Sequence, residues 1–468
     1  MLVIIEARDK IIARLGDTLL PHTKILKDIQ DSLKDLKIEK PDHVDHNQER
    51  ERRPYNRFQN LLGQKFNAKG YDRGWTSLRF EKKFQWGPSR TTNFFEEVGE
   101  SGFRKDNQNL MQGRLRSKFT LDPAELFKTW NQSTDCCIKW EGVACDSSGR
   151  VVNLSRSGIF SPILDDPAFM VGTISPSLGK LKFLRLLDLN NLKRLTGTIP
   201  PELGKLSNLT TLNLNANQLK GSIPASFQNL RKLNKLYLND NLLSGTVPTN
   251  IFQHMSSLTE INLSENQLSG GIPSSIDKLV SLKSLELHHN NFSGSIPSTI
   301  GNLKNLVYLI LSNNQISGYI PSSISKLKFL NSIYLSNNKL TGSIPALIGN
   351  TALQILILDN NMLSGDLPKS FGNLANLLGL VATNNRLTGK IPSNFNNLKN
   401  LQNFVISRNG LSGQIPSGVI NLPDLVEFIV SHNKLTGKIP PHKKAFPASF
   451  FEGNSGLCDS PLPPCKTT

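Results

Sequence analysis

A phrase of about 24 residues recurs twelve times between residues 169 and 440, and this repetition constrains the fold more than any other feature. A copy this short cannot bury its apolar face alone, so successive copies must stack on one another. The sequence therefore predicts a solenoid. Its repeated glycine stands at Gly172, Gly197, Gly221, Gly245, Gly270, Gly294, Gly318, Gly342, Gly365, Gly389, Gly413 and Gly437.

The clearest copy, residues 209–224, shows what each position in a coil does. Leu212 and Leu214 alternate with polar residues, which is the period of a β-strand, so we expect one short parallel strand per coil. Gly221 permits a turn in which a Cβ would clash. Pro224 follows Ile223 and directs the chain along the convex side, where a missing N–H matters little. A helical repeat is excluded because glycine and proline recur in every period.

An asparagine follows each strand and is interpreted as a structural ladder. The chain turns inward there, and a side-chain amide, with donors and an acceptor together, can bond the buried backbone groups of adjacent coils. The ladder is predicted at Asn217, Asn241, Asn266, Asn290, Asn314, Asn338, Asn361, Asn385, Asn409 and Asn433.

The composition and motifs favour a binding protein over an enzyme. The 468 residues are 38% hydrophobic, enough for a large core, and no apolar run reaches the 18 residues of a membrane span. Dinucleotide-binding, phosphate-binding and nucleophile-elbow motifs are absent from the sequence, so we expect no catalysis and no cofactor. His288 and His289 lie near Glu286, but ordinary concave-face residues are favoured over a metal site.

Residues 1–114 differ from the rest and are expected to be a disordered or foreign segment. The apolar start, residues 1–5, is shorter than a secretory signal requires. Residues 51–90 interleave basic and aromatic side chains, a pattern that can bind single-stranded nucleic acid. An intracellular protein that associates with nucleic acid through 51–90 is therefore an alternative function, although nucleic acid is the less favoured partner.

Organised sequence resumes at residue 115, where Asp122 and Pro123 predict the start of a helix. The phrases Cys-Cys-Ile-Lys-Trp-Glu-Gly-Val-Ala-Cys (136–145) and Gly-Arg-Val-Val-Asn-Leu (149–154) follow. With the Leu-x-Gly-x-Ile-Pro repeat they resemble plant extracellular leucine-rich-repeat proteins, including polygalacturonase inhibitors, DNA-damage-repair/toleration-type proteins and receptor-kinase ectodomains. The resemblance implies a right-handed α/β solenoid of about 12 coils with a parallel sheet on its concave face. The expected domains are the N-terminal cap (115–150), the repeats (151–440) and the C-terminal cap (441–468).

The resemblance also implies how the five cysteines pair. It matches Cys137 with Cys145 and Cys458 with Cys465, and it leaves Cys136 without its usual upstream partner. The cysteine spacings fit no zinc-binding pair, so no metal is expected.

Secretory origin and a cell-wall or apoplastic location are implied by the resemblance. Five Asn-x-Ser/Thr sequons fit that origin and are candidate glycosylation sites. They are Asn131, Asn153, Asn208, Asn262 and Asn291.

The variable strand positions face the concave side, because strand residues alternate sides. The column four places before the ladder asparagine begins polar, at Asn213, and becomes apolar from Ile310 onward. We expect the apolar part to anchor a protein partner, with Tyr334 as the main contact and polar residues beside it. The predicted contact residues are Lys235, Tyr237, Glu260, Glu286, His288, Tyr308, Ile310, Tyr334, Ile357, Asp359, Val381, Val405 and Ile429.

Two functions fit these expectations besides nucleic-acid association. The favoured one is a non-enzymatic binding module of the plant cell wall that recognises a protein or peptide, such as a microbial polygalacturonase that it inhibits. The alternative is a soluble or truncated receptor or co-receptor ectodomain in signalling or defence. Basic outer loops, with lysines such as Lys180 and Lys205, make anionic wall polysaccharide a further candidate partner, although solvating charge is the favoured interpretation.

Deleting residues 1–114 should leave the melting temperature of the remaining chain unchanged. The segment has few clustered apolar residues beyond its first forty, and ordering it would cost about 1–2 kcal/mol per residue. Calorimetry of the two chains would test this, and a large drop in the shortened chain would contradict it.

Overall fold

The computed structural model describes residues 118–122, 125–131, 133–158 and 170–465. The segment 1–114, its nucleic-acid hypothesis and the deletion prediction lie outside these residues.

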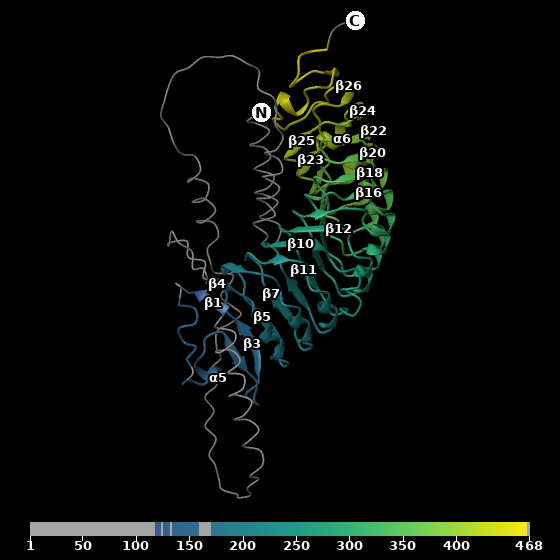
Figure 1. Ribbon diagram of the computed structural model, residues 1–468. Coiled ribbons are helices and arrows are strands. Elements are labelled where there is room, and N and C mark those ends of the chain that lie inside the picture. The colour runs from purple at the N-terminus through teal and green to yellow at the C-terminus, as the bar shows by residue number, and fades with distance from the viewer. Residues whose placement is uncertain (1–117, 123–124, 132, 159–169, 466–468) are drawn as a thin grey trace, which may run out of the picture. The chain divides into compact units, whose positions relative to one another are not determined.

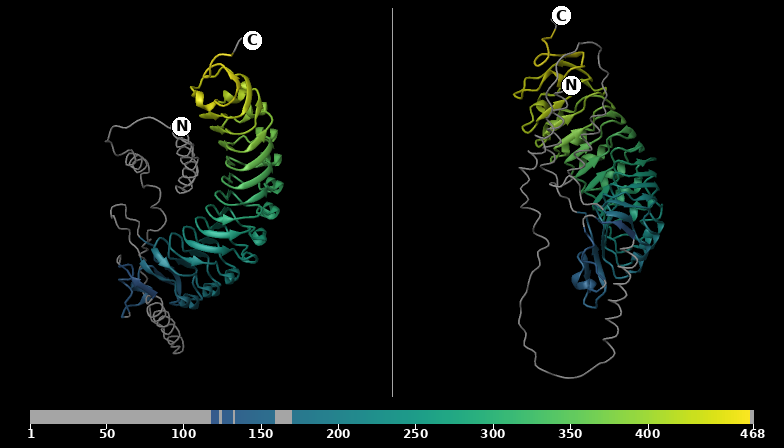
Figure 2. Two further views of the ribbon diagram at one scale, coloured as in Figure 1. Left: turned by 45° about the horizontal axis from the view of Figure 1, so that its top comes forward. Right: turned by 60° about the vertical axis from the view of Figure 1, so that its left-hand side comes forward.

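A single sheet of thirteen strands runs through the described repeats (Figure 1). Its strands are parallel except for the first pair, in which β2 runs antiparallel to β3. In Figure 2 these strands lie on the inner side of a curved stack of coils. The strands are β2 (Val143–Cys145), β3 (Val151–Ser155), β5 (Leu186–Asp188), β7 (Thr211–Asn213), β9 (Lys235–Tyr237), β11 (Glu260–Asn262), β13 (Ser284–Glu286), β15 (Tyr308–Ile310), β17 (Ser332–Tyr334), β19 (Ile355–Ile357), β21 (Gly379–Val381), β23 (Asn403–Val405) and β25 (Glu427–Ile429).

The predicted leucine positions form the core. Leu212 of β7 pairs in register with Leu187 and Leu236 in the neighbouring coils. Leu212, Leu214 and Leu219 are fully buried. In the three-residue strands of the main sheet, from β5 to β25, the middle residue points into the solenoid, so its two neighbours lie on the concave side. The parallel sheet predicted from the Leu-x-Leu alternation is confirmed.

A second set of strands pairs beyond the ladder asparagines and holds successive coils together again. They include β8 (Lys220–Gly221), β10 (Leu242–Thr246), β12 (Gln267–Gly270) and β14 (Asn291–Phe292) in one sheet and β16 (Ser317–Tyr319), β18 (Lys339–Ser343), β20 (Met362–Asp366) and β22 (Arg386–Thr388) in another. Toward the ends lie β1 (Phe119–Leu121), β4 (Met170–Thr173) and β6 (Lys193–Thr196), and β24 (Ser412–Gly413), β26 (Lys434–Lys438) and β27 (Gly456–Cys458).

The convex side consists mainly of 3₁₀-helices, because a coil of about 24 residues leaves only one short turn after the proline. Pro224, for example, precedes the first residue of its helix, where a missing N–H costs nothing. The helices are η3 (Pro176–Lys180), η4 (Pro201–Lys205), η5 (Ala225–Asn229), η6 (Ser274–Lys278), η7 (Ser298–Asn302), η8 (Ser322–Lys326), η9 (Ala346–Asn350), η10 (Lys369–Asn373), η11 (Ser393–Asn397) and η12 (Ala448–Phe450), with α5 (Cys136–Lys139) and α6 (Ser417–Ile420).

The repeated glycine has two structural roles. Gly221 has a φ of +80°, which L side chains rarely adopt, as the sequence predicted. Gly172 has no such φ, but a Cβ there would lie 2.6 Å from the carbonyl oxygen of Lys118. Gly172 pairs with Phe119 in the antiparallel pair β1–β4, so its small size admits the cap strand.

The N-terminal cap covers the first coil with aromatic side chains. The ring centroid of Trp130 lies 4.4 Å from that of Phe127 and 5.1 Å from that of Trp140. The Asp122 carboxylate accepts hydrogen bonds from the backbone N–H groups of Leu126 (2.8 Å) and Phe127 (2.9 Å). Residues 126–129 are turns, so the helix expected after Asp122 is a capped turn instead. Among the described residues, no helix is long and apolar enough to cross a membrane.

Candidate functional site

The apolar column predicted on the concave face lies in strict register. Tyr334 pairs with Ile310 on one side and with Ile357 on the other, and the pairing continues through the next strands. We use "apolar column" for Ile310, Tyr334, Ile357, Val381, Val405 and Ile429.

The apolar column is largely shielded from water although the leucine core lies on the other side of the sheet. Ile310 is 1% exposed, Tyr334 8% and Ile357 4%. The polar counterparts Asn213 and Asn262 in earlier coils are only half-buried. The column therefore changes in polarity along the concave face, from Asn213, Asn262 and the buried Glu286 to apolar side chains.

Tyr308 and Tyr334 lie on the paired strands β15 and β17 of this region. Tyr308 is the first residue of β15 and pairs with Ser332, while Tyr334 pairs with Ile310 at the other end of the same strand pair. Burial raises the pKa of Tyr334 well above its ordinary value, and the neighbouring Tyr308 adds to the effect. The phenol therefore stays neutral and can contribute apolar area and a hydrogen-bond donor together.

The earlier concave strands carry a polar cluster that includes three predicted contact residues. Lys235 Nζ lies 3.0 Å from Glu260 Oε1. Tyr237 donates a hydrogen bond to the other oxygen of the same carboxylate. Burial and this hydrogen bond raise the pKa of Tyr237. The sequence predicted these residues as a polar flank, and the structure brings them together on the adjacent strands β9 and β11.

Glu286 connects this cluster to the next coil. Its carboxylate accepts hydrogen bonds of 2.9 Å from Asn262 Nδ2 and from Ser284 Oγ. His288 follows at 3% exposure, and its ring centroid lies 5.8 Å from that of His289. Glu286 thus belongs to a largely buried hydrogen-bonded network on the concave side of the sheet.

Asp359 is a buried carboxylate beside the apolar column. Ser336 Oγ donates to its Oδ1 over 2.8 Å, and Asn360 Nδ2 donates to its Oδ2 over 3.3 Å. Burial raises the pKa of Asp359 to about 6, and the hydrogen bond from Ser336 opposes this rise. Its charge therefore changes within a pH range that proteins commonly encounter.

The asparagine ladder bonds each coil to the one before it. Asn241 Nδ2 donates to the carbonyl oxygen of Leu214 in the preceding coil (3.0 Å) and to those of Leu238 and Asn239 in its own. Its Oδ1 accepts the N–H of Leu219 at 2.9 Å. The nine ladder residues from Asn241 to Asn433 share this pattern. Asn217 Nδ2 donates in the same way, but its buried Oδ1 has no hydrogen-bond partner.

The sequence-based prediction missed one further ladder asparagine and a separate set of four asparagines. Asn454 extends the ladder into the C-terminal cap, where its Oδ1 accepts the N–H of Leu435 at 3.0 Å. The second set directly precedes four ladder residues and is visible in the sequence as repeated Asn-Asn pairs. It consists of Asn313, Asn337, Asn360 and Asn384.

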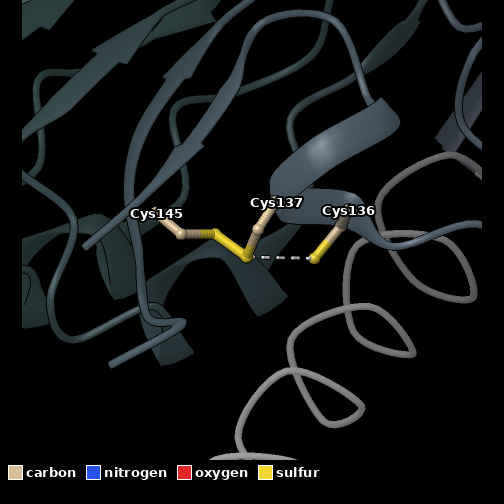
Figure 3. A group of neighbouring side chains, drawn as sticks. All are labelled: Cys136, Cys137 and Cys145. Atoms are coloured by element: carbon tan, nitrogen blue, oxygen red, sulfur yellow. Dashed lines mark hydrogen bonds between the residues drawn. A yellow bond between two sulfur atoms is a disulfide. The ribbon is translucent and has the colours of Figure 1, made fainter. Parts of the chain in front are cut away.

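Disulfides close both caps with the implied pairing. Cys137 bonds Cys145, and Cys458 bonds Cys465. Cys136 takes part in neither disulfide, and its buried Sγ lies 3.9 Å from Cys137 Sγ (Figure 3). A zinc site formed by Cys136, Cys137 and Cys145 would require three thiolates, but the sulfurs of Cys137 and Cys145 are joined in a disulfide.

The five sequons occupy different environments. Asn131 and Asn291 are exposed, and Asn208 bonds the carbonyl oxygen of Lys182 through its Nδ2. Asn153 lies within β3, and Asn262 lies on the concave face, where it bonds Glu286. The exposed positions are the ones best suited to carry a glycan.

Comparison with known proteins places these features in a family. Leucine rich repeat models match residues 208–230, 245–292, 294–340 and 352–374, and the leucine rich repeat N-terminal domain matches 111–146. The DNA damage-repair/toleration protein DRT100 of Arabidopsis thaliana is 37% identical over 99 residues, which are 20% of this chain and 27% of that protein.

Solved plant receptors share the fold. The peptide hormone receptor RGFR1, in complex with RGF2, is 37% identical with a TM-score of 0.57, over 58% of this chain and 43% of that one. The Arabidopsis receptor kinase HAESA, in complex with the peptide hormone IDA and the co-receptor SERK1, is 32% identical with a TM-score of 0.58, over 72% and 59%. The chain thus spans less than two thirds of each of these relatives. Its repeats and caps form a leucine-rich-repeat solenoid, which is similar to these plant proteins.

Proposed function

We propose that this protein is a non-enzymatic binding module of the plant cell wall or apoplast, which holds a protein or peptide on its concave face. The apolar column carries the proposal. Its six apolar side chains stand in register on the side of the sheet opposite the leucine core. These side chains lie outside the leucine core, on the face that strand alternation turns toward a partner, and we take them as its apolar anchor.

The polar cluster of Lys235, Tyr237 and Glu260 complements this anchor. Charged and hydrogen-bonding groups beside an apolar patch fix the register of a partner and reject wrong ones. The concave strand positions carry more acidic than basic side chains, which disfavours nucleic acid as their ligand. A protein surface or an extended peptide can contact both the apolar column and the polar cluster.

Inhibition of a microbial wall-degrading enzyme, such as a polygalacturonase, is the favoured role of this binding. A receptor or co-receptor ectodomain is the second candidate, supported by the likeness to RGFR1 and HAESA, which were solved with peptide hormones. Titrating the protein into a fungal polygalacturonase assay, and separately against a peptide display library, would distinguish the two. Inhibition without selected peptides supports the first role, and selected peptides without inhibition support the second.

Tyr334→Ala should weaken partner binding at least tenfold, about 1.4 kcal/mol, while leaving the fold intact. Aromatic anchors at patch centres contribute most to binding energy, and Tyr334 lies between Ile310 and Ile357. Biolayer interferometry with the partner selected above would measure the loss. Tyr319→Ala is the matched control, because Tyr319 is 70% exposed on β16, outside the main sheet. A partner that tolerates Tyr334→Ala together with Ile357→Asp would exclude concave-face binding.

A further inference from the structure

The second set of asparagines forms its own chain of side-chain hydrogen bonds, which we call the amide row. Asn337 Nδ2 donates to Asn313 Oδ1 at 2.6 Å, and Asn360 Nδ2 donates to Asn337 Oδ1 at 2.7 Å. Asn384 Nδ2 donates to Asn360 Oδ1 at 2.9 Å. Unlike the ladder, which bonds the backbone, the amide row links side chain to side chain across four coils.

The amide row begins at a histidine. Asn313 Nδ2 lies 2.7 Å from His289 Nε2, while Asn313 Oδ1 accepts from Asn337. Since the amide presents its N–H to the ring, Nε2 must act as an acceptor, which requires neutral imidazole with its proton on Nδ1. The protonation state of His289 is thereby tied to the direction of the entire row.

Charges at equivalent positions of neighbouring coils match this direction. Glu265 precedes His289 by one coil, and Arg408 follows Asn384 by one coil; all four have a φ of 51–54°. Every row amide points its N–H end toward the Glu265 side and its oxygen toward the Arg408 side. Negative charge near the donors and positive charge near the acceptors stabilise the arrangement while His289 is neutral.

The row also touches the buried Asp359, to which Asn360 Nδ2 donates. That contact suits an ionised carboxylate, which only accepts hydrogen bonds. If the Asn360 amide turned over, its oxygen would face Asp359, and this is favourable only when the carboxyl carries a proton.

We propose that the amide row is a proton-responsive element of the concave face, in which proton uptake by His289 reverses the donor–acceptor direction from Asn313 to Asn384. Protonated His289 carries N–H on both ring nitrogens, so its Nε2–H would oppose the amide N–H of Asn313. Rotating the Asn313 amide by about 180° places its oxygen against the His289 N–H, but its NH₂ group then faces the NH₂ group of Asn337. Asn337 must rotate in turn, and the same conflict repeats in each following coil until every row amide has rotated.

The surroundings set the pH range of this change. The His288 ring lies beside His289, and Glu265 stands at the equivalent position of the preceding coil. The groups that contact Asp359 are the neutral Ser336 and Asn360. Asp359 becomes neutral as the pH falls through about 6, because burial raises its pKa, so its opposition to the turned Asn360 disappears in the same range.

The inference rests on the proposed concave-face function for its consequence. Below the transition the face loses the negative charge of Asp359, and the row exposes the opposite ends of its amides. A partner that places a cationic group near Asp359 should therefore bind more weakly in acid.

The direct test needs no partner, so it can fail independently of the proposed function. Side-chain amide spectra of protein labelled with ¹⁵N-asparagine would be followed from pH 7.5 to 5, with signals assigned by single Asn→Asp substitutions. The four row amides should shift together with one midpoint, while the ladder amides of Asn314 and Asn338 stay in place. Row signals that remain unchanged over this range would overturn the proposal.

Two pairs of variants sharpen the test. His289→Gln can offer an oxygen to Asn313 at every pH, so the row signals should keep their pH 7.5 positions, whereas the control His254→Gln should titrate like the wild type. Asn360→Ala interrupts the row, so the shifts should reach Asn337 but not Asn384. Asp359→Asn removes the opposing carboxylate and should move the midpoint to higher pH. Equal titration in wild type and His289→Gln, or shifts that pass Asn360→Ala, would refute the reversal.

Discussion

Replacing Asn241 with alanine should lower the free energy of unfolding by about 3–5 kcal/mol, as judged from the hydrogen bonds that the side chain makes. Its amide group satisfies three backbone carbonyl oxygens and the N–H of Leu219. Alanine removes all four bonds, and the buried position offers few routes for water to replace them. Leaving buried backbone groups without partners costs about 1–3 kcal/mol each.

Urea unfolding followed by circular dichroism would measure the change. Asn239→Ala is the matched control, because Asn239 lies two positions earlier on the concave side and is half-buried. We expect the control to change stability by about 0.5 kcal/mol or less. Equal losses in the two variants would mean that the ladder bonds do not support the coils.

Trp130→Ala should cost about 3–5 kcal/mol, and the damage should concentrate at the N-terminal end. Trp130 is 1% exposed, stacks on Trp140 and donates from Nε1 to the carbonyl oxygen of Glu141 at 3.0 Å. Because each coil contacts only its neighbours, loss of a cap exposes the first coil before any other.

Hydrogen exchange would show where the loss falls. Backbone amides of β3 should lose protection in Trp130→Ala, while those of β25 at the other end of the sheet should keep theirs. Trp130→Phe serves as the control, since it keeps an aromatic ring in the cap and should cost less than the alanine variant. Uniform loss of protection along the sheet would contradict a local role for the cap.

Features that repeat with a local cause could be predicted from the sequence. Leu212 and its counterparts face the core because strand residues alternate, and Asn241 is needed because the turn beside it leaves backbone groups without partners. The cap pairing of Cys137 with Cys145 came from the family resemblance. Asn454 was missed because the C-terminal cap lacks the Leu-x-Gly-x-Ile-Pro frame that marks the other ladder positions.

The candidate site could be predicted only as a set of positions. The sequence placed Tyr334 and Ile357 in one column, but the pattern did not reveal how deeply both side chains are buried. The polar contact between Lys235 and Glu260 follows from strand register, which fixes neighbours but not side-chain conformations. The amide row has a direction because each side chain orients the next, and no single residue encodes that orientation.

The reach of the ladder bonds has a consequence for how this protein can change over evolution. Asn338 bonds Leu311 one coil back, and Asn314 bonds Leu287 in the same way, so the junctions joined by the nine ladder residues from Asn241 to Asn433 are chemically interchangeable. Unequal recombination that removes or duplicates one whole coil therefore rejoins the chain without leaving a backbone group unbonded. The length of the recognition surface can therefore change in units of one strand.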